Sequence, residues 1–383
     1  MAFGTTLLLV MASAAFFQSA VGVLGPVLIA EFSIRTGQVG WLAAVMSLVA
    51  AGLAPVAGRI VDRQGHRRVI IAMFLLSGIA LWTAALAPSF PLLLLASSLS
   101  GIAMAAANPA TNAAIRRELP VGERGSVAGL KQSGVKFGQF VTGFALPPLI
   151  PIVGWRPAVA VVGAAAACCI LLAVPSLRPV PVEQPRASVH GPAAVRSPLV
   201  TALLTYVLVM AAAQSAILTY LPLFAFEVVG FGVRDAGFTI GVLTGVAVIA
   251  RIIWARLTER SEAIATSLVA LALQGLFGSA LLFFGHHLHI AWFWLGIVLV
   301  GASVATWNAV VQMAIIDRVP SREQGRAAGV VQVAFLLGLA TGPIVYGQLY
   351  DLTGAHGFGA SVVAMGLVGA ALWARWGISG RGS

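Results

Sequence analysis

Apolar stretches of about twenty residues follow one another along almost the whole chain, separated by short breaks that contain charged residues, proline or glycine. A helix of about 20 apolar residues is long enough to cross the roughly 30 Å hydrocarbon core of a bilayer. Only 9% of the residues are charged, whereas soluble proteins carry about 25%. A membrane β-barrel would instead show alternating segments of about ten residues. The sequence therefore predicts an all-α membrane protein with twelve spans, at approximately 5–30, 38–57, 69–87, 91–115, 126–150, 156–175, 199–226, 235–256, 265–284, 290–316, 326–349 and 357–378.

The basic residues are distributed unevenly between the predicted loops. With the N-terminus placed in the cytoplasm, 17 of the 23 basic residues fall on the cytoplasmic side, three fall outside and three lie within spans. This positive-inside bias predicts that both termini are cytoplasmic and that the protein is a multi-pass protein of the cytoplasmic (inner) membrane. It also explains the net charge of +11 without a nucleic-acid partner. The first apolar stretch exceeds the 7–15 residues of a signal-peptide core, so we expect it to be a retained helix.

The chain contains an internal repeat. "QSAVGVLGPVLIAE", from Gln18 to Glu31, aligns with "QSAILTYLPLFAFE", from Gln214 to Glu227, and "LPVGERGSVAGLKQ", ending at Gln132, aligns with "VPSREQGRAAGVVQ", ending at Gln332. Two six-helix halves in the same orientation predict a pseudo-two-fold axis along the membrane normal, with a cavity between the halves. We expect an N-terminal bundle at 1–175, a proline-rich cytoplasmic linker at 176–198 and a C-terminal bundle at 199–383.

Three basic residues lie inside predicted spans. Lys131 and Lys136, the only lysines in the chain, fall in the fifth span, and Arg251 falls in the eighth. A cation in this environment costs at least about 2.5–3.5 kcal/mol and normally faces a cavity or a partner, although a lysine near a span end can reach the headgroups. The repeat indicates that the scaffold does not require these charges, because the equivalent positions in the other half carry Val331, Leu336 and Ala54.

The acidic residues all lie in loops or at span ends, and no histidine lies within a predicted span to neutralise these cations. Two explanations remain: desolvation deprotonates a lysine, or a mobile anion supplies the missing charge. Gln132, Lys136 and Gln139 share a helical face, as expected of a helix that lines a cavity. The repeat-related glutamines and asparagines, with one tryptophan, are further neutral candidates, although polar residues also hold helices together. The predicted substrate-binding residues are therefore Lys136, Arg251, Lys131, Gln132, Gln139, Gln18, Gln214, Asn108, Asn308 and Trp307.

The loop between the second and third spans reads "GRIVDRQGHRR", from Gly58 to Arg68. It resembles the signature loop of the major facilitator superfamily, with histidine at position 66 where arginine or lysine is usual. A degenerate copy, "ARLTER", occupies the equivalent loop of the second half. The resemblance implies a fold of two six-helix bundles and a conformational latch, in which an acid bonds arginines and the amides of a neighbouring helix; a simple positive-inside anchor is the alternative. The predicted latch residues are Gly58, Asp62, Arg63, Gly65, Arg67, Arg68, Glu259 and Arg260.

The eighth span, "IARIIWARLTER", is similar to the corresponding segment of monocarboxylate and oxalate–formate carriers within that superfamily, where an arginine meets the substrate carboxylate. An arginine binds a carboxylate bidentately, and a lysine acts as a point charge. The resemblance implies a secondary transporter that moves a small organic anion, such as a carboxylate, by alternating access. Coupling to a proton, to sodium or to a counter-anion stays open, and we expect a monomer.

Two other functions are less consistent with the sequence. A drug–proton antiporter would resemble its relatives in having a membrane-embedded acid, which the predicted spans lack. A membrane sensor or enzyme would need a soluble domain or a catalytic cluster, and no nucleophile–base pair or phosphate loop is apparent. "HHLH" at 286–289 resembles a metal motif, but we expect a solvated turn because no acidic or cysteine ligand is adjacent. We therefore expect neither enzymatic activity nor a cofactor nor a metal.

Overall fold

The computed structural model describes residues 2–178, 198–258, 263–319 and 321–377. The predicted all-α fold is confirmed for these residues, which form helices joined by short turns. The helices are α1 (Ala2–Phe32), α2 (Thr36–Gln64), α3 (His66–Ala85), α4 (Phe90–Glu118), η1 (Val121–Glu123), α5 (Arg124–Val153), α6 (Trp155–Cys168), α7 (Ile170–Ser176), α8 (Pro198–Glu227), α9 (Val233–Leu257), α10 (Ala263–Phe284), η2 (Gly285–His287), α11 (Ile290–Ala302), α12 (Asn308–Arg318), α13 (Ser321–Thr353) and α14 (His356–Gly377).

Within these ranges, nine helical segments are long and apolar enough to cross a membrane. They coincide with nine of the twelve predicted spans. The three remaining predicted spans fall on α5, which carries both lysines, on the pair α11–α12, and on α14. The twelve-span count and the orientation of the termini therefore stay predictions.

The predicted span at 290–316 is not one continuous helix. It is divided into α11 and α12 by a turn at residues 303–307. The hydroxyl groups of Ser303 and Thr306 donate to the carbonyl oxygens of Leu299 (2.7 Å) and Gly301 (2.9 Å), and the indole N–H of Trp254 donates to Ala302 (2.9 Å). Side chains thus satisfy carbonyl groups that the interrupted helix leaves free, which makes a break tolerable inside an apolar bundle.

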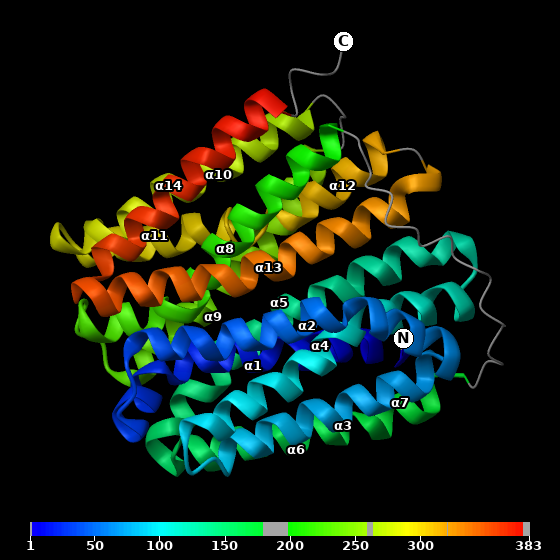
Figure 1. Cartoon of the computed structure of the whole chain (residues 1–383), viewed down its shortest axis with the longest axis horizontal. Coiled ribbons are helices and arrows are strands. Elements are labelled where there is room, and N and C mark those ends of the chain that lie inside the picture. Colours follow the sequence, from blue (N-terminus) through cyan, green and yellow to red (C-terminus); the bar gives the residue numbers. More distant parts are fainter. Residues whose placement is uncertain (1, 179–197, 259–262, 320, 378–383) are drawn as a thin grey trace.

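The helices form two groups that follow the order of the chain. Helices α1 to α7 pack mainly on one another, as do α8 to α14, and the groups meet where α1 crosses α8, α2 contacts α13, and α5 contacts α9. In Figure 1 the blue-to-green helices of the first half occupy the lower part and most helices of the second half the upper part. The predicted boundaries at 176–198 fall largely on residues 179–197, which lie outside the described residues.

At one end of the bundle the two groups are in close contact. The backbone N–H of Gly37 in α2 donates to Oδ1 of Asp351 in α13 at 3.0 Å. A Cβ atom added at Gly40 would collide with the carbonyl oxygen of Pro343, and one added at Gly143 in α5 would collide with the backbone of Gly241 in α9. We call this end, which carries the turns α1–α2 and α13–α14, the closed end.

At the opposite end of the bundle, the faces of α2, α5 and α13 that meet the other half at the closed end are not in close contact. Each of these three helices carries a second glycine about four or five turns away on the same face. The pairs are Gly40 and Gly58 in α2, Gly143 and Gly129 in α5, and Gly347 and Gly329 in α13. A Cβ atom added at the second glycine of each pair would meet no atom within 4 Å. We call this end, where both chain termini lie (Figure 1), the open end.

Candidate functional site

Helix α5 places its two lysines inside the bundle. Glycines at positions 134 and 138 of α5 contact the backbone of α1 so closely that an added Cβ atom would collide with the carbonyl oxygens of Leu8 and Ala12. This packing fixes the rotation of α5 and buries the face that carries Lys131 and Lys136, whose residues are only 2% and 5% exposed. Both lysines are thus buried, as the sequence predicts for residues of a cavity-lining or interface helix.

Lys131 has a complete set of neutral partners. Its Nζ donates to Oδ1 of Asn108 at 3.2 Å, to Oγ1 of Thr111 at 2.9 Å and to Oδ1 of Asn112 at 2.6 Å. An ammonium group has three N–H donors, so each donor has one oxygen acceptor. All three acceptors come from α4, and Lys131 therefore joins α4 to α5 within the first half. Sequence analysis missed Thr111 and Asn112, although their spacing of three and four residues from Asn108 places all three on one helical face.

Lys136 is less well satisfied. Its Nζ donates to Oε1 of Gln139, three residues further along α5, at 3.1 Å. Among the described residues this is the one hydrogen bond of the Lys136 ammonium group. Its two other N–H donors have no protein acceptor there. The ammonium group also lies within electrostatic range of Arg251, a second positive charge. Within the described residues, the charge that acts on the deeper lysine of α5 is therefore that of another cation.

Arg251 belongs to α9 in the second half and reaches across to the first. Its Nη1 donates to the carbonyl oxygen of Gln132 in α5 at 3.4 Å, one turn before Lys136 in the same helix. The side chain is half-buried. Gln132, Lys136, Gln139 and Arg251, four of the predicted binding residues, thus lie together where α5 packs on α9.

Acidic residues do not neutralise these cations within the described ranges. Three of them form ion pairs elsewhere: Glu31 with Arg156, Glu118 with His66, and Glu227 with His356. Each pair lies at an end of the bundle, and none includes a lysine or Arg251. As the sequence predicts, none of these acidic residues pairs with a basic residue inside a predicted span.

The neutral candidates are spread over two other places. Gln18 in α1 donates from Nε2 to Oγ of Ser215 in α8 at 3.2 Å, which joins the two halves. Trp307 and Asn308 lie at the break between α11 and α12. The Nε1 atom of Trp307 and the Oδ1 atom of Asn308 are buried there without a hydrogen-bond partner among the described residues. Gln214 borders a small gap beside the same break. In the part of the chain that the structure describes, no hydrogen bond joins these residues to Lys136 or Arg251.

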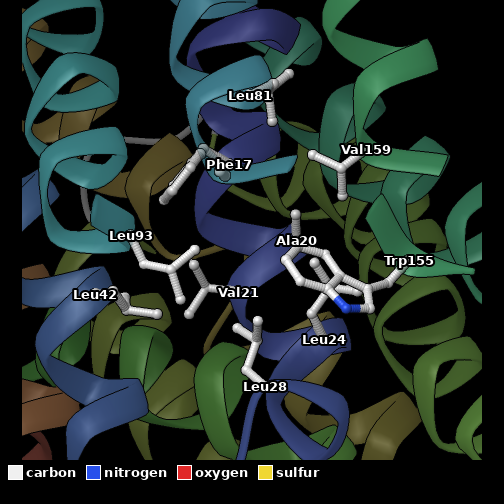
Figure 2. Close-up of a pocket in the computed structure, with 11 residues that line it drawn as sticks. Phe17, Ala20, Val21, Leu24, Leu28, Leu42, Leu81, Leu93, Trp155 and Val159 are labelled. Carbon is white, nitrogen blue, oxygen red and sulfur yellow. The ribbon is translucent and has the colours of Figure 1, made fainter. Parts of the chain in front are cut away.

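A small apolar cavity lies away from this site. It lies within the first half, between α1, α2, α3, α4 and α6, and Figure 2 shows its apolar lining around Trp155. Its volume of about 20 Å³ suffices for one water molecule, but a buried water needs polar partners. We interpret it as a packing gap. The lining residues are Phe17, Ala20, Val21, Leu24, Leu28, Leu42, Leu81, Ala84, Leu93, Trp155 and Val159.

The predicted latch loop turns at Gly65, between the end of α2 and the start of α3. This residue has a φ of 83°, a conformation that glycine adopts without strain, and it joins α2 directly to α3. His66 is buried and its Nε2 lies 2.6 Å from Oε1 of Glu118, while Arg67 donates to the carbonyl oxygen of Val174 at 3.1 Å. Asp62 is exposed and has no hydrogen-bond or ion-pair partner in the described ranges. The remaining latch candidates Gly58, Arg63 and Arg68 are half-buried or exposed, and Glu259 and Arg260 lie outside the described residues.

A sequence profile of the Major Facilitator Superfamily matches residues 7–343 of the chain. The chain belongs to this superfamily. The match covers both repeats, the loop from Gly58 to Arg68, and the helices that carry Lys136 and Arg251. The predicted resemblance is therefore confirmed, and the protein is a membrane transporter rather than an enzyme.

Two curated members of the superfamily are similar over most of their length. The probable sulfoacetate transporter of Cupriavidus necator is 24% identical over 362 residues, which cover 88% of this chain and 84% of the relative. The probable nitrate/nitrite transporter of Mycobacterium tuberculosis is 28% identical over 333 residues, covering 84% and 82%. Both relatives are named for small anions.

Solved structures of superfamily members share the fold. A nucleoside transporter matches with a TM-score of 0.74 at 12% identity, over 98% of this chain and 99% of that one. A bacterial homologue of the human lysosomal transporter Spinster, in an inward-facing and occupied conformation, matches with a TM-score of 0.73 at 16% identity, over 98% and 94%. At these identities the likeness concerns the fold alone.

Proposed function

We propose that this superfamily member transports a small organic anion, such as a carboxylate, across the cytoplasmic membrane by alternating access. One observation carries the proposal: Lys136 and Arg251, buried or half-buried cations from the two halves, lie within electrostatic range of each other, and no acid pairs with them in the described part of the chain. Uncompensated charges in a dry interior are costly. An anion bound between them would remove their repulsion and bring the halves together through attraction to both.

The names of the curated relatives favour the same class of cargo. Sulfoacetate and nitrate differ in size and chemistry, but both are small anions. In contrast, drug–proton antiport gains no support from these relatives, and no acid pairs with Lys136 or Arg251 in the described ranges. We infer that Arg251 binds the anion through its planar N–H groups, and that Lys136 contributes a point charge with its two unused donors.

We assign Lys131 a different role from Lys136. Since Asn108, Thr111 and Asn112 occupy its three donors, an anion would have to displace one of these oxygens to bind it directly. We propose that Lys131 holds α4 against α5 and keeps the binding helix in position. Its charge also attracts anions toward the site from the open end.

The two ends of the bundle fit an alternating-access cycle. The closed end is sealed by the contacts of α2 with α13 and of α5 with α9, whereas the equivalent glycines at the open end meet no atom. With the orientation that the arginines predict, the open end faces the cytoplasm. We propose that Asp62, which has no partner in this state, bonds α13 when the open end closes, so that the two ends close in turn.

The proposal is tested by the thermal stability of the purified full-length protein. Nitrate, acetate and sulfoacetate are the probes, and we expect at least one to raise Tm in a saturable way. Lys136→Leu and Arg251→Ala should weaken that binding by about 2–5 kcal/mol, the usual loss when one member of a buried charge pair is removed. Arg234→Ala is the matched control, because this exposed arginine of α9 lies at the closed end beside Phe238. Absence of a response to any anion, or equal losses in the control, would reject the assignment.

A further inference from the structure

A group of polar side chains joins three helices at the closed end of the second half. The Nε2 of His356 in α14 lies 3.0 Å from Oε2 of Glu227 in α8, and its Nδ1 lies 3.0 Å from the hydroxyl oxygen of Tyr346 in α13. Tyr350, one turn further along α13, donates its hydroxyl proton to the same carboxylate oxygen at 2.9 Å. The histidine side chain is 4% exposed and that of the glutamate is 29% exposed. We call these four residues the closed-end cluster.

The contacts define one protonation state in which every donor has an acceptor. A neutral histidine donates from one ring nitrogen and accepts at the other. If Nε2–H donates to the carboxylate of Glu227, then Nδ1 accepts the hydroxyl proton of Tyr346. Tyr346 is 1% exposed, so that this proton has no access to water as an alternative acceptor. An ionised Glu227 and a neutral His356 thus satisfy the whole cluster.

The cluster is connected to the seal between the two halves. The ring of Tyr346 stacks on that of Tyr220, with 4.5 Å between centroids. The hydroxyl oxygen of Tyr220 lies 3.3 Å from the carbonyl oxygen of Thr36 at the start of α2 and 3.2 Å from that of Pro343 in α13, and its single proton can bond either of them. Tyr350 immediately precedes Asp351, which accepts the backbone N–H of Gly37. Both tyrosines of the cluster are therefore adjacent to groups that hold α2 against the second half.

The repeat provides a comparison within the chain. Glu31, the mate of Glu227, is bonded by Nη2 of Arg156 at 2.7 Å and by the indole N–H of Trp155. An arginine stays charged at every physiological pH, so that pair does not titrate. In the second half the corresponding carboxylate is bonded by a histidine, the side chain that changes charge between about pH 5 and 8. The two halves have the same acid at the closed end, but only the second has a partner that binds protons reversibly.

Other charged groups near the cluster are few. Asp351 adds a second carboxylate from α13, and Arg35 lies exposed at the start of α2. His286, in η2, lies on Phe224, whose ring also contacts His356. No lysine or arginine bonds Glu227 within the described residues, where its partners are Tyr350 and His356.

We propose that the Glu227–His356 pair is a proton-binding site that controls the closed end, and that binding of a proton opens this end. A proton on Nδ1 of His356 turns the acceptor of the Tyr346 hydroxyl into a donor. The buried hydroxyl proton then has no acceptor, and Tyr346 must move, which disturbs its stacking on Tyr220. A proton on Glu227 instead weakens the acceptor shared by His356 and Tyr350. In either case the contacts next to α2 are weakened.

Distance measurement between spin labels tests this proposal in the full-length protein. Labels at Leu86→Cys and Leu288→Cys, introduced with Cys168→Ala and Cys169→Ala, report the width of the closed end, because each lies in an exposed turn there, one in each half. Without any transported anion, we expect the ratio of open to closed populations to rise about fivefold or more from pH 7.5 to 5.5, since linkage to one proton allows up to about tenfold per pH unit.

Three variants identify the site. In His356→Gln and Glu227→Gln the ratio should no longer depend on pH, whereas His287→Gln, which removes an exposed histidine of the same end, should respond like the wild type. If His356→Gln does not fold, Tyr346→Phe replaces it. Phenylalanine has no hydroxyl proton, so protonation of His356 cannot leave one without an acceptor. The pH response of this variant should therefore be strongly reduced.

Three results would overturn the proposal: a wild-type ratio that is constant with pH, a ratio that falls in acid, or a response that persists without His356. A response that disappears in His66→Gln would place the proton at the open end, on the Glu118–His66 pair, and would also reject it. These measurements use none of the anions that serve as transport probes, so that they succeed or fail independently of the proposed transport function.

Discussion

Arg251 of the second half donates a hydrogen bond to the carbonyl oxygen of Gln132 in the first half at 3.4 Å. The accepting carbonyl lies one helical turn before Lys136, on which the charge of Arg251 acts, and no carboxylate pairs with either residue in the described ranges. Two like charges at a contact between halves are destabilising unless something neutralises them. This repulsion is the reason for proposing that an anion binds between Lys136 and Arg251.

The first prediction contrasts the two lysines of α5. Lys136→Leu should leave Tm unchanged or raise it, because the substitution removes a poorly satisfied buried charge and the repeat mate is Leu336. Lys131→Val should lower the free energy of unfolding by about 1–3 kcal/mol, because it leaves the acceptors of α4 without their donor. Thermal unfolding of both variants in the same detergent provides the comparison. A loss of stability in Lys136→Leu, with none in Lys131→Val, would reverse these two roles.

This contrast indicates what the sequence does and does not reveal about the site. The buried lysines and the missing counter-charge are predictable, because an apolar span makes every charge conspicuous. The difference between Lys131 and Lys136 is not predictable from hydropathy, because the repeat mates Val331 and Leu336 are equally apolar. It depends on the polar face of α4 that meets α5, which only the packing of the two helices reveals.

The helices can be predicted from the sequence more completely than the breaks within them. Long apolar stretches predict helices because the bilayer leaves the backbone no other hydrogen-bond partners. The break at 303–307 has no such signal: alanine, valine and serine also occur in continuous helices, and the break is stabilised by a side chain from another helix, Trp254. The polar contacts of the closed end are likewise between residues far apart in sequence, such as Gly37 and Asp351.

The second prediction concerns the seal at the closed end. Gly40→Ala should shift the protein toward a state with this end open, because the added Cβ atom collides with a carbonyl oxygen of α13 that cannot turn away. Overpacking of this kind costs about 1–3 kcal/mol, which corresponds to a shift of roughly 5- to 150-fold. Gly52→Ala is the control on the same helix, because its Cβ atom meets no atom within 4 Å. The distance between labels at positions 86 and 288 measures the shift, and equal effects of the two substitutions would contradict it.

The third prediction concerns Trp307. Its buried indole N–H has no partner among the described residues, so Trp307→Phe should cost less than the usual loss for a core tryptophan. If this N–H instead contacts the transported anion, the variant should keep its Tm without anion and lose part of the anion-dependent rise. Tm with and without saturating anion distinguishes the two roles. A large loss of stability without anion, of about 3 kcal/mol or more, would indicate that the ring acts by packing alone.

The fourth prediction concerns orientation. A reporter fused after Ser383, or inserted within residues 176–198, should be found in the cytoplasm, and one inserted beside His287 should be found outside. The reason is the excess of arginine at the open end of the bundle. His287 lies in η2 at the closed end, so an external reporter there would also establish that the closed end faces outward. A cytoplasmic reporter at His287 would contradict both the twelve-span arrangement and the proposed direction of opening.

The last prediction concerns the transport cycle itself. If an anion binds between Lys136 and Arg251 as proposed, its negative charge offsets their repulsion, and we expect the halves to exchange their closed and open ends at a moderate cost. Without an anion the two cations repel each other across the α5–α9 contact, and the described ion pairs contribute no carboxylate to compensate them. The empty protein should therefore change conformation more slowly than the loaded one. In liposomes that contain unlabelled anion, exchange of labelled anion should be faster than net flux into liposomes without it. Neutralisation by Lys136→Leu should reduce this difference, and equal rates of exchange and net flux in the wild type over a range of pH would contradict the prediction.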